Sequence, residues 1–186
     1  VFSIVADENI DFIFHLAAQV EVGVALANPL ATWQSNIVGT FNVLEAARLH
    51  APNLKSVVLA STDKSYGEYP LDMMPYREDY PLKPKYPYDV SKACGDMIAR
   101  CYGRDCYGLP LVVSRFANIY GPGQMNFSAI IPDLCRAALG YGEFEPRGDG
   151  SQVRDYIFVS DVVELYLRIA SKLATSRDSL SMDVYN

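Results

Sequence analysis

Ser56-Val-Val-Leu-Ala60-Ser-Thr-Asp-Lys64 joins a short apolar run to a group of polar side chains. The apolar part is short and β-branched, which favours a strand buried inside a parallel sheet. Polar residues that directly follow such a strand lie at its carboxyl end, where open α/β sheets bind their ligands. The sequence therefore predicts a strand over 56–60 and a candidate site beginning at Ser61, with an ordinary solvated turn as the alternative.

The segments on either side repeat the same pattern of short strands and longer helices. Residues 10–18 form a mostly apolar run that reads as a central parallel strand, and residues 111–116 form a third strand. Between them, residues 29–50 and 88–107 have apolar side chains at helical spacing. Strands that alternate with helices predict parallel βαβ units with right-handed crossovers, and therefore a layered α/β fold.

The sequence of the C-terminal third predicts further helices and a short strand. A helix is expected near 129–139, a strand over 155–159 and a second helix over 162–173. These pieces are expected to form part of a small substrate-facing lobe. The predicted division is a main cofactor and catalytic domain over 1–143 and a partial substrate-binding region over 144–186.

Composition excludes several classes of function. Half of the residues are hydrophobic and the net charge is −6, so we expect no nucleic-acid partner. Apolar runs stay well short of the roughly 20 residues that cross a bilayer, which predicts no membrane association and a cytoplasmic protein. Two histidines and four cysteines without a C-x-x-C pair predict no metal site. The cysteines are expected to be reduced thiols, mostly packing residues: Cys94, Cys101, Cys106 and Cys135.

Tyr88 and Lys92 form the pair that points to catalysis. A spacing of four residues at the start of a helix places both side chains on one face, one turn apart. An ammonium there, together with the positive end of the helix dipole, would lower the pKa of the phenol and make Tyr88 a general base. Alone the spacing is weak, because a solvated lysine beside a surface tyrosine gives the same pattern.

Six motifs in order carry a resemblance that covers nearly the whole chain. The motifs are His15-Leu-Ala-Ala-Gln19, Asn36-Ile-Val-Gly-Thr40, Ser61-Thr-Asp-Lys-Ser-Tyr-Gly67, Tyr88-Asp-Val-Ser-Lys92, Arg115-Phe-Ala-Asn-Ile-Tyr-Gly-Pro122 and Arg154-Asp-Tyr-Ile-Phe-Val-Ser-Asp161. With them the sequence resembles the extended short-chain dehydrogenases/reductases, and within these the NAD-dependent nucleotide-sugar epimerases and dehydratases. The resemblance implies a Rossmann-like parallel sheet flanked by helices that lacks its first strands.

The resemblance also implies roles for single residues. Tyr88 would take the proton of a sugar hydroxyl while NAD takes the hydride from the same carbon, and Thr62 would hydrogen-bond the reacting oxygen. Lys92 would hold the nicotinamide ribose and lower the pKa of Tyr88. Asn118 and Arg154 would contact the nucleotide-sugar, and the planar guanidinium of Arg154 suits a diphosphate. Further positions would line the cofactor cleft, namely Leu16, Ala17, Ala18, Gln19 and Asn36.

Asp63 and Lys64 distinguish reactions within the resemblance. Similar epimerases carry small residues after the catalytic Ser or Thr, whereas 4,6-dehydratases place an acid/base pair there. A nucleotide-sugar 4,6-dehydratase is therefore the leading hypothesis and a 4-epimerase the alternative. The Asp-Lys pair is similar to that of the CDP-glucose 4,6-dehydratases, but the Arg154 motif resembles the general epimerase/dehydratase pattern. The identities of the nucleotide and the sugar therefore stay open. A homodimer built on the helices 29–50 and 88–107 is also expected.

The chain departs from the resemblance in one respect. The G-x-x-G-x-x-G turn, whose amides approach a dinucleotide pyrophosphate, is not found in the 186 residues. The glycines of Gly121-Pro-Gly-Gln-Met-Asn126 do not open an adjacent helix and are rejected as such a turn. The sequence is therefore expected to be an internal fragment. A non-catalytic domain that keeps the motifs by descent is a further alternative.

Overall fold

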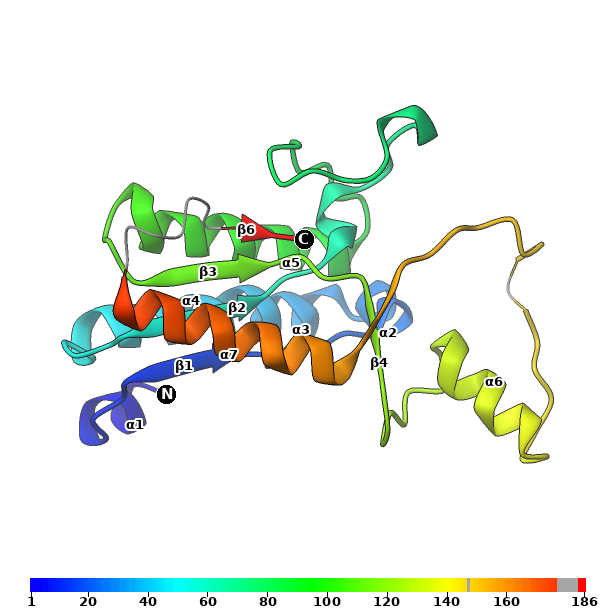
Figure 1. Ribbon diagram of the computed structural model, residues 1–186, viewed down its shortest axis with the longest axis horizontal. Coiled ribbons are helices and arrows are strands. Elements are labelled where there is room, and N and C mark those ends of the chain that lie inside the picture. Colours follow the sequence, from blue (N-terminus) through cyan, green and yellow to red (C-terminus); the bar gives the residue numbers. More distant parts are fainter. Residues whose placement is uncertain (147, 177–183) are drawn as a thin grey trace.

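The computed structural model describes residues 1–146, 148–176 and 184–186. Within these residues the main sheet has four parallel strands, with β2 (Ser56–Ala60) and β3 (Leu111–Ser114) at its centre. Their neighbours on the two sides are β1 (Phe12–His15) and β6 (Val184–Tyr185). Figure 1 shows the strands running side by side in one direction. The predicted parallel α/β sheet is confirmed, but the strand predicted over 10–18 as central is the shorter β1, at the edge of the sheet that the described residues form.

Side chains of the central strands alternate between two apolar cores. Val57 and Leu59 pack on one face of the sheet with the helix α4 (Gly39–His50), whereas Val58 packs on the other face. Both faces are covered, so every side chain of β2 except the last is buried. This is why β2 reads as a continuous apolar run rather than an alternating one.

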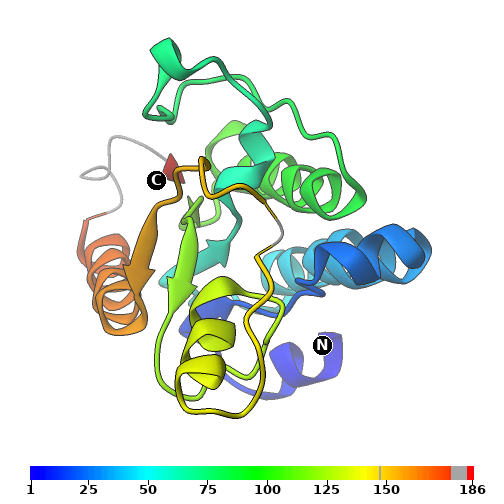
Figure 2. The ribbon, with the colours of Figure 1, turned by 90° about the vertical axis from the view of Figure 1, so that its right-hand side faces the viewer.

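Helices cover both faces of the sheet. On one side lie α4 and α5 (Pro87–Arg100), and on the other side α7 (Val159–Thr175) packs its residues Tyr166 and Ile169 against Val58. Figure 2 shows the sheet between these layers, with α7 apart from the blue and green helices. The short helices α1 (Phe2–Asp7) and α2 (Val22–Ala27) lie at the N-terminal part of the chain.

Two predicted helices contain a wider turn. The predicted helix over 29–50 consists of α3 (Pro29–Trp33), the π-helical turn η1 (Gln34–Val38) and α4. The helix α5 likewise continues into the π-helical turn η4 (Cys101–Asp105). Such turns hold an i→i+5 hydrogen bond, which residue periodicity does not reveal. Short helical turns also follow β2, at η2 (Asp63–Tyr66) and η3 (Leu71–Met73).

The segment that stands apart from the main sheet begins after β3. It contains β4 (Asn118–Tyr120), α6 (Ile130–Ala138) and β5 (Tyr156–Phe158), with β4 and β5 paired in parallel. Figure 1 shows α6 at the end of the molecule, away from the layers. β4 was not predicted, because three residues show too little periodicity.

Two elements that follow residue 143 pack with the main layers, and the division into two domains stays a prediction. α7 contacts the core through Tyr166 and Ile169, and β6 is hydrogen-bonded to β3, so both belong to the main layers. The apolar stripe of α7 is buried because it lies against the sheet. Within the described residues, no helix is long and apolar enough to cross a membrane, and no group of His, Cys, Asp and Glu could hold a metal ion.

Candidate functional site

Tyr88 and Thr62 meet at the carboxyl end of β2. Pro87 occupies the first turn of α5 and the Asp89 carboxylate accepts the amide of Tyr86 at 3.4 Å, so the helix begins just before Tyr88. Tyr88 is 8% exposed and Thr62 is buried, and the two hydroxyls share a hydrogen bond. The structure thus brings together two predicted site residues that are 26 positions apart in sequence.

Lys92 lies one turn further along α5 and reaches the same strand end. Its ammonium donates to the carbonyl oxygen of Ala60 at 2.6 Å. Burial lowers the pKa of Lys92 to about 8 and raises the pKa of Tyr88 to about 12. We refer to Thr62, Tyr88 and Lys92, whose catalytic role is a prediction, as the catalytic corner.

The expected effect of Lys92 on Tyr88 is not seen in the structure. Burial is the largest influence on the pKa of Tyr88 and raises it, the hydrogen bond with Thr62 lowers it, and Asp63 and Asp89 raise it. The Lys92 charge is directed at the Ala60 carbonyl instead. The correction follows from burial, which disfavours the phenolate. Tyr88 therefore holds its proton at neutral pH in this arrangement.

Asp63 and Lys64 form the rim of the catalytic corner. The Thr62 hydroxyl donates to Asp63 Oδ1 at 3.0 Å and accepts the amide of Lys64 at 3.4 Å, which begins the turn η2. The Lys64 ammonium lies 3.8 Å from Asp63 Oδ1, and both side chains are partly open to solvent. Since Asp63 and Asp89 both raise the pKa of Tyr88, negative charge gathers around this phenol. A carboxylate and an ammonium therefore stand beside Tyr88.

Asn36 joins three of the motifs through its side-chain amide. Its Oδ1 accepts the amide of Gln19 at 2.7 Å, and its Nδ2 donates to the Gln19 carbonyl and to Ser91 Oγ, each at 2.9 Å. Ser91 Oγ in turn donates to the Tyr88 carbonyl at 2.7 Å. Both Nδ2 protons are thus used inside the protein, which gives Asn36 a positioning role. Its contact with a cofactor stays a prediction.

Residues after β1 lead into the same region. His15 Nε2 lies 2.9 Å from Thr40 Oγ1, and burial together with the charge of Lys92 lowers the pKa of His15, so the imidazole is neutral at neutral pH. Leu16 and Ala17 are exposed, whereas Ala18 and Gln19 are half-buried. The strand end predicted to line the cofactor cleft is therefore partly open and lies near Lys92.

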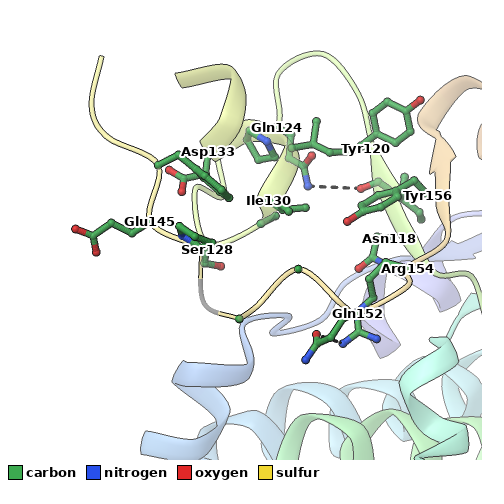
Figure 3. Close-up of a pocket in the computed structure, with 18 residues that line it drawn as sticks. Asn118, Tyr120, Gln124, Ser128, Ile130, Asp133, Glu145, Gln152, Arg154 and Tyr156 are labelled. Carbon is green, nitrogen blue, oxygen red and sulfur yellow. Dashed lines mark hydrogen bonds between the residues drawn. The ribbon is translucent and has the colours of Figure 1, made fainter. Parts of the chain in front are cut away.

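A second concave region is formed by β4, α6 and the segment before β5. The pocket has a volume of about 410 Å³, and Asn118 and Arg154 both line it. Arg154 donates to Gln152 Oε1 at 2.8 Å, and Asn118 donates to the Asp155 carbonyl at 2.9 Å. Figure 3 shows Asn118, Gln152 and Arg154 on one side of the pocket and Asp133 and Glu145 on the other. We call this region the outer pocket.

These observations can be compared with known proteins. Residues 1–185 match the family described as NAD dependent epimerase/dehydratase family. The chain belongs to this family. The predicted resemblance is thereby confirmed, and NAD is the cofactor on which the family depends.

Relatives of this family member include dehydratases. It is 34% identical over 96% of its length to a trifunctional UDP-glucose 4,6-dehydratase, epimerase and reductase of Arabidopsis thaliana, and covers 28% of that protein. It is 38% identical over 81% of its length to the dTDP-glucose 4,6-dehydratase of Mycolicibacterium smegmatis, and covers 44% of it. The chain thus spans less than half the length of these relatives.

Solved structures of the family include both reaction types. One is a UDP-N-acetylglucosamine 4-epimerase from Methanobrevibacter ruminantium, with a TM-score of 0.81 and 31% identity over 100% of this chain and 56% of that one. Another is a dTDP-glucose 4,6-dehydratase from Streptomyces venezuelae with NAD bound, with a TM-score of 0.80 and 32% identity over 94% and 52% of the two chains. Fold similarity therefore does not separate the two reactions.

The nicotinamide end of NAD fits the residues of this family member. The Lys92 ammonium has three protons and the Ala60 carbonyl takes one of them at the carboxyl end of β2. The remaining donors suit ribose hydroxyls, and Tyr88 lies one helical turn away. The glycine-rich turn that suits a pyrophosphate is not found among the 186 residues, so the fit extends to the nicotinamide and its ribose.

Sequence reasoning gave no role to a buried ion pair below the catalytic corner. Arg115 donates to both carboxylate oxygens of Asp96, at 2.7 and 2.9 Å, and also to the Tyr66 hydroxyl and the Glu78 carbonyl. The side chains of Arg115 and Asp96 are 1% and 0% exposed. The pair joins α5 to β3 and to the long loop after β2. The available signal was the arginine at the end of β3, a charge directly following a buried strand.

Proposed function

We propose that the whole protein carrying this chain is an NAD-dependent nucleotide-sugar 4,6-dehydratase. The observation that carries the proposal is the placement of the Asp63 carboxylate and the Lys64 ammonium beside the Tyr88 and Thr62 hydroxyls. Oxidation alone needs one base, whereas removal of water needs a second base and an acid. The dehydratases among the relatives support this proposal.

In the first step, the Tyr88 oxygen accepts the proton of the sugar hydroxyl at the fourth carbon, and Thr62 hydrogen-bonds that oxygen. NAD, when bound, would supply the hydride acceptor for this carbon and the hydride donor for the sixth carbon. Since the pKa of Tyr88 is about 12 in the structure, this base requires a cation beside the phenol. Lys92 meets that requirement if its ammonium turns from the Ala60 carbonyl toward Tyr88.

The new ketone acidifies the proton on the fifth carbon of the sugar. One member of the Asp63–Lys64 pair removes this proton, and the other protonates the hydroxyl that leaves the sixth carbon as water. The hydride then adds to the sixth carbon and a proton returns to the fifth. Which of the two residues is the base and which is the acid is left open, because both side-chain types can act as proton donors or acceptors in catalysis.

The outer pocket is the proposed place for the nucleotide diphosphate. Arg154 is exposed at its wall and its present hydrogen bonds are to its close neighbours Gln152 and Val153. A guanidinium released from such bonds can bind two phosphate oxygens at once. Asn118 adds an amide at the same wall. The nucleotide, whether uridine, thymidine or cytidine diphosphate, is left open.

We also propose a cytoplasmic homodimer. The helices α3, α4 and α5 carry large apolar side chains that are exposed, and pairing them with a second copy would remove this surface from water. Sedimentation at micromolar concentration tests the assembly, and a monomer would contradict it. The exposed side chains are Trp33, Phe41 and Met97.

The reaction is tested with two variants of the whole protein. Lys64→Met should still allow slow reduction of bound NAD, because the oxidation groups remain, while the 4-keto-6-deoxy product falls roughly 10²- to 10⁴-fold. Tyr88→Phe should suppress both signals by a similar factor. Single-turnover absorbance of the reduced cofactor and chromatography of the sugar product measure the two steps separately.

Lys172→Met is the matched control, since Lys172 is an exposed lysine on α7 in the opposite layer. It should leave both steps unchanged. If Lys64→Met forms the deoxy product at a near-normal rate, the dehydratase proposal fails. A wild-type protein that yields only the 4-epimer would establish the epimerase alternative, which the 4-epimerase among the solved structures supports.

A further inference from the structure

Two cysteines lie side by side at the end of the helix that carries the catalytic corner. Cys101 and Cys106 begin and follow the π-helical turn η4, and their sulfur atoms are 3.4 Å apart, with the Cys101 thiol donating to Cys106. Cys101 is half-buried and Cys106 is exposed. Neither residue takes part in the proposed reaction. The other two cysteines, Cys94 and Cys135, are free as well.

The π-helical turn is what brings these residues together. On an α-helix, positions i and i+5 point in different directions, because one turn contains only about 3.6 residues. Here the Cys106 amide donates to the Cys101 carbonyl at 3.0 Å, which closes an i→i+5 turn and places both side chains on one side. Gly103 leaves helical geometry inside the turn, with φ −74° and ψ −121°.

The surroundings hold this turn in place on one side only. Tyr102, between the two cysteines, is buried and donates its hydroxyl to Glu45 of α4 at 2.8 Å. Cys106 lies after the turn and faces solvent. A buried anchor thus fixes the Cys101 end, while the Cys106 sulfur stays accessible to small reagents.

We propose that Cys101 and Cys106 form a peroxide-sensitive dithiol site that closes to an intramolecular disulfide. The sulfurs need to approach by only about 1.4 Å to reach the bond length of roughly 2.05 Å. The hydrogen bond to Cys106 raises the pKa of Cys101, which keeps Cys101 protonated and leaves the exposed Cys106 as the first nucleophile. This site is independent of the proposed dehydratase reaction.

The oxidation balances with hydrogen peroxide as the oxidant. The Cys106 thiolate attacks one peroxide oxygen, the O–O bond breaks, and the products are a sulfenic acid and, after protonation, one water. The Cys101 sulfur then attacks the Cys106 sulfur, the S–O bond breaks, and a second water leaves. Two thiols lose two protons and two electrons in total, and the peroxide is reduced to two waters.

The experiment treats the folded chain with millimolar hydrogen peroxide, blocks remaining thiols and digests it with trypsin. Cleavage after Arg100, Arg104 and Arg115 separates the two cysteines into the peptides 101–104 and 105–115. The expected result is one species joining these peptides, lighter by two hydrogen atoms than their sum and released by dithiothreitol. In urea the π-helical turn is absent, so the same treatment should no longer give the Cys101–Cys106 link in preference to other cysteine pairs.

Cys135→Ser is the matched control, because Cys135 is an exposed thiol elsewhere, and the joined peptides should persist in this variant. Cys101→Ser should abolish them and leave Cys106 to oxidise further to sulfinic acid. The proposal is overturned if wild type gives the sulfinic acid at Cys106 without joined peptides. It is equally overturned if Cys106 pairs with Cys94 or Cys135, or with a second chain, in preference to Cys101.

Discussion

The catalytic corner and the outer pocket are built in different ways. Thr62 and Tyr88 come from segments attached to β2 and α5, and both are buried between the sheet and its helices. Arg154 and Asn118 come from a loop and a three-residue strand, and their hydrogen bonds reach a neighbour in sequence or an adjacent backbone carbonyl. The core therefore fixes the contact between Thr62 and Tyr88, whereas the wall of the outer pocket rests on the short β4–β5 pair and on exposed hydrogen bonds.

Neutralising one partner of the buried Arg115–Asp96 ion pair should reduce the free energy of unfolding more than any change near the outer pocket. Asp96→Asn leaves the Arg115 guanidinium buried without its counter-charge, so the free energy of unfolding should fall by about 3–5 kcal/mol. Urea unfolding followed by circular dichroism measures this loss.

The matched change near the outer pocket is Asp133→Asn. Its partner Arg136 lies 2.7 Å away, but the arginine side chain is 37% exposed, so the loss should stay below about 1 kcal/mol. Equal losses in the two variants would contradict the claim that only the catalytic corner rests on the core.

Comparing wild type with Lys92→Met tests the burial of the catalytic corner through the pH dependence of the free energy of unfolding. The pKa of Lys92 is lowered to about 8 in the folded protein, from an unfolded value near 10.5. Between these values the unfolded chain binds more protons than the folded one, so the folded protein gains stability as pH rises and loses it as pH falls toward 8.

The free energy of unfolding of wild type should therefore rise by about 1–3 kcal/mol relative to Lys92→Met between pH 8 and pH 10.5. The tyrosines with raised pKa act in the opposite direction above pH 10, but they are common to both proteins and cancel in the difference. Urea titrations of both proteins across this range provide the measurement. A difference that does not vary with pH would show that Lys92 is not desolvated.

The smallest effect on stability is expected at Arg154. Because this side chain is exposed and bonds its own neighbours, Arg154→Ala should change the free energy of unfolding by less than about 0.5 kcal/mol. Its effect should instead be on ligand affinity, with a loss of roughly tenfold or more for UDP or dTDP in calorimetry. Tyr88→Phe serves as the control and should keep the nucleotide affinity. If Arg154→Ala lowered the free energy of unfolding as much as Asp96→Asn, the proposed contrast between the outer pocket and the buried core would be wrong.

Several elements could be read from the sequence because their signals are local. The strand predicted over 56–60 has the same bounds in β2, and the helix predicted over 129–139 closely matches α6. Short apolar runs and helical periodicity are properties of neighbouring residues. The two-residue β6 and the three-residue β4 are too short for such a signal, and they exist because a partner strand offers hydrogen bonds.

The candidate site divides in the same way. The motif spacing alone indicated which side chains gather near the carboxyl end of β2, since Thr62 follows that strand and Tyr88 and Lys92 share a helix face. The direction of the pKa shift of Tyr88 was predicted wrongly, because this pKa is raised mainly by burial and also by Asp63 and Asp89. Burial is a property of the assembled layers and has no local pattern.

The sequence by itself determined the α/β class, the family and the identity of the groups at the catalytic corner, because strand and helix periodicity and motif order are encoded in neighbouring residues. Only the tertiary structure decided that Lys92 faces the Ala60 carbonyl, that Arg115 and Asp96 pair in the core and that α7 joins the main layers. These contacts link residues that are far apart along the chain. The apolar contacts of α7 gain free energy by excluding water, whereas the buried polar groups need one another as partners once water is excluded. Both conditions arise only when the whole fold closes.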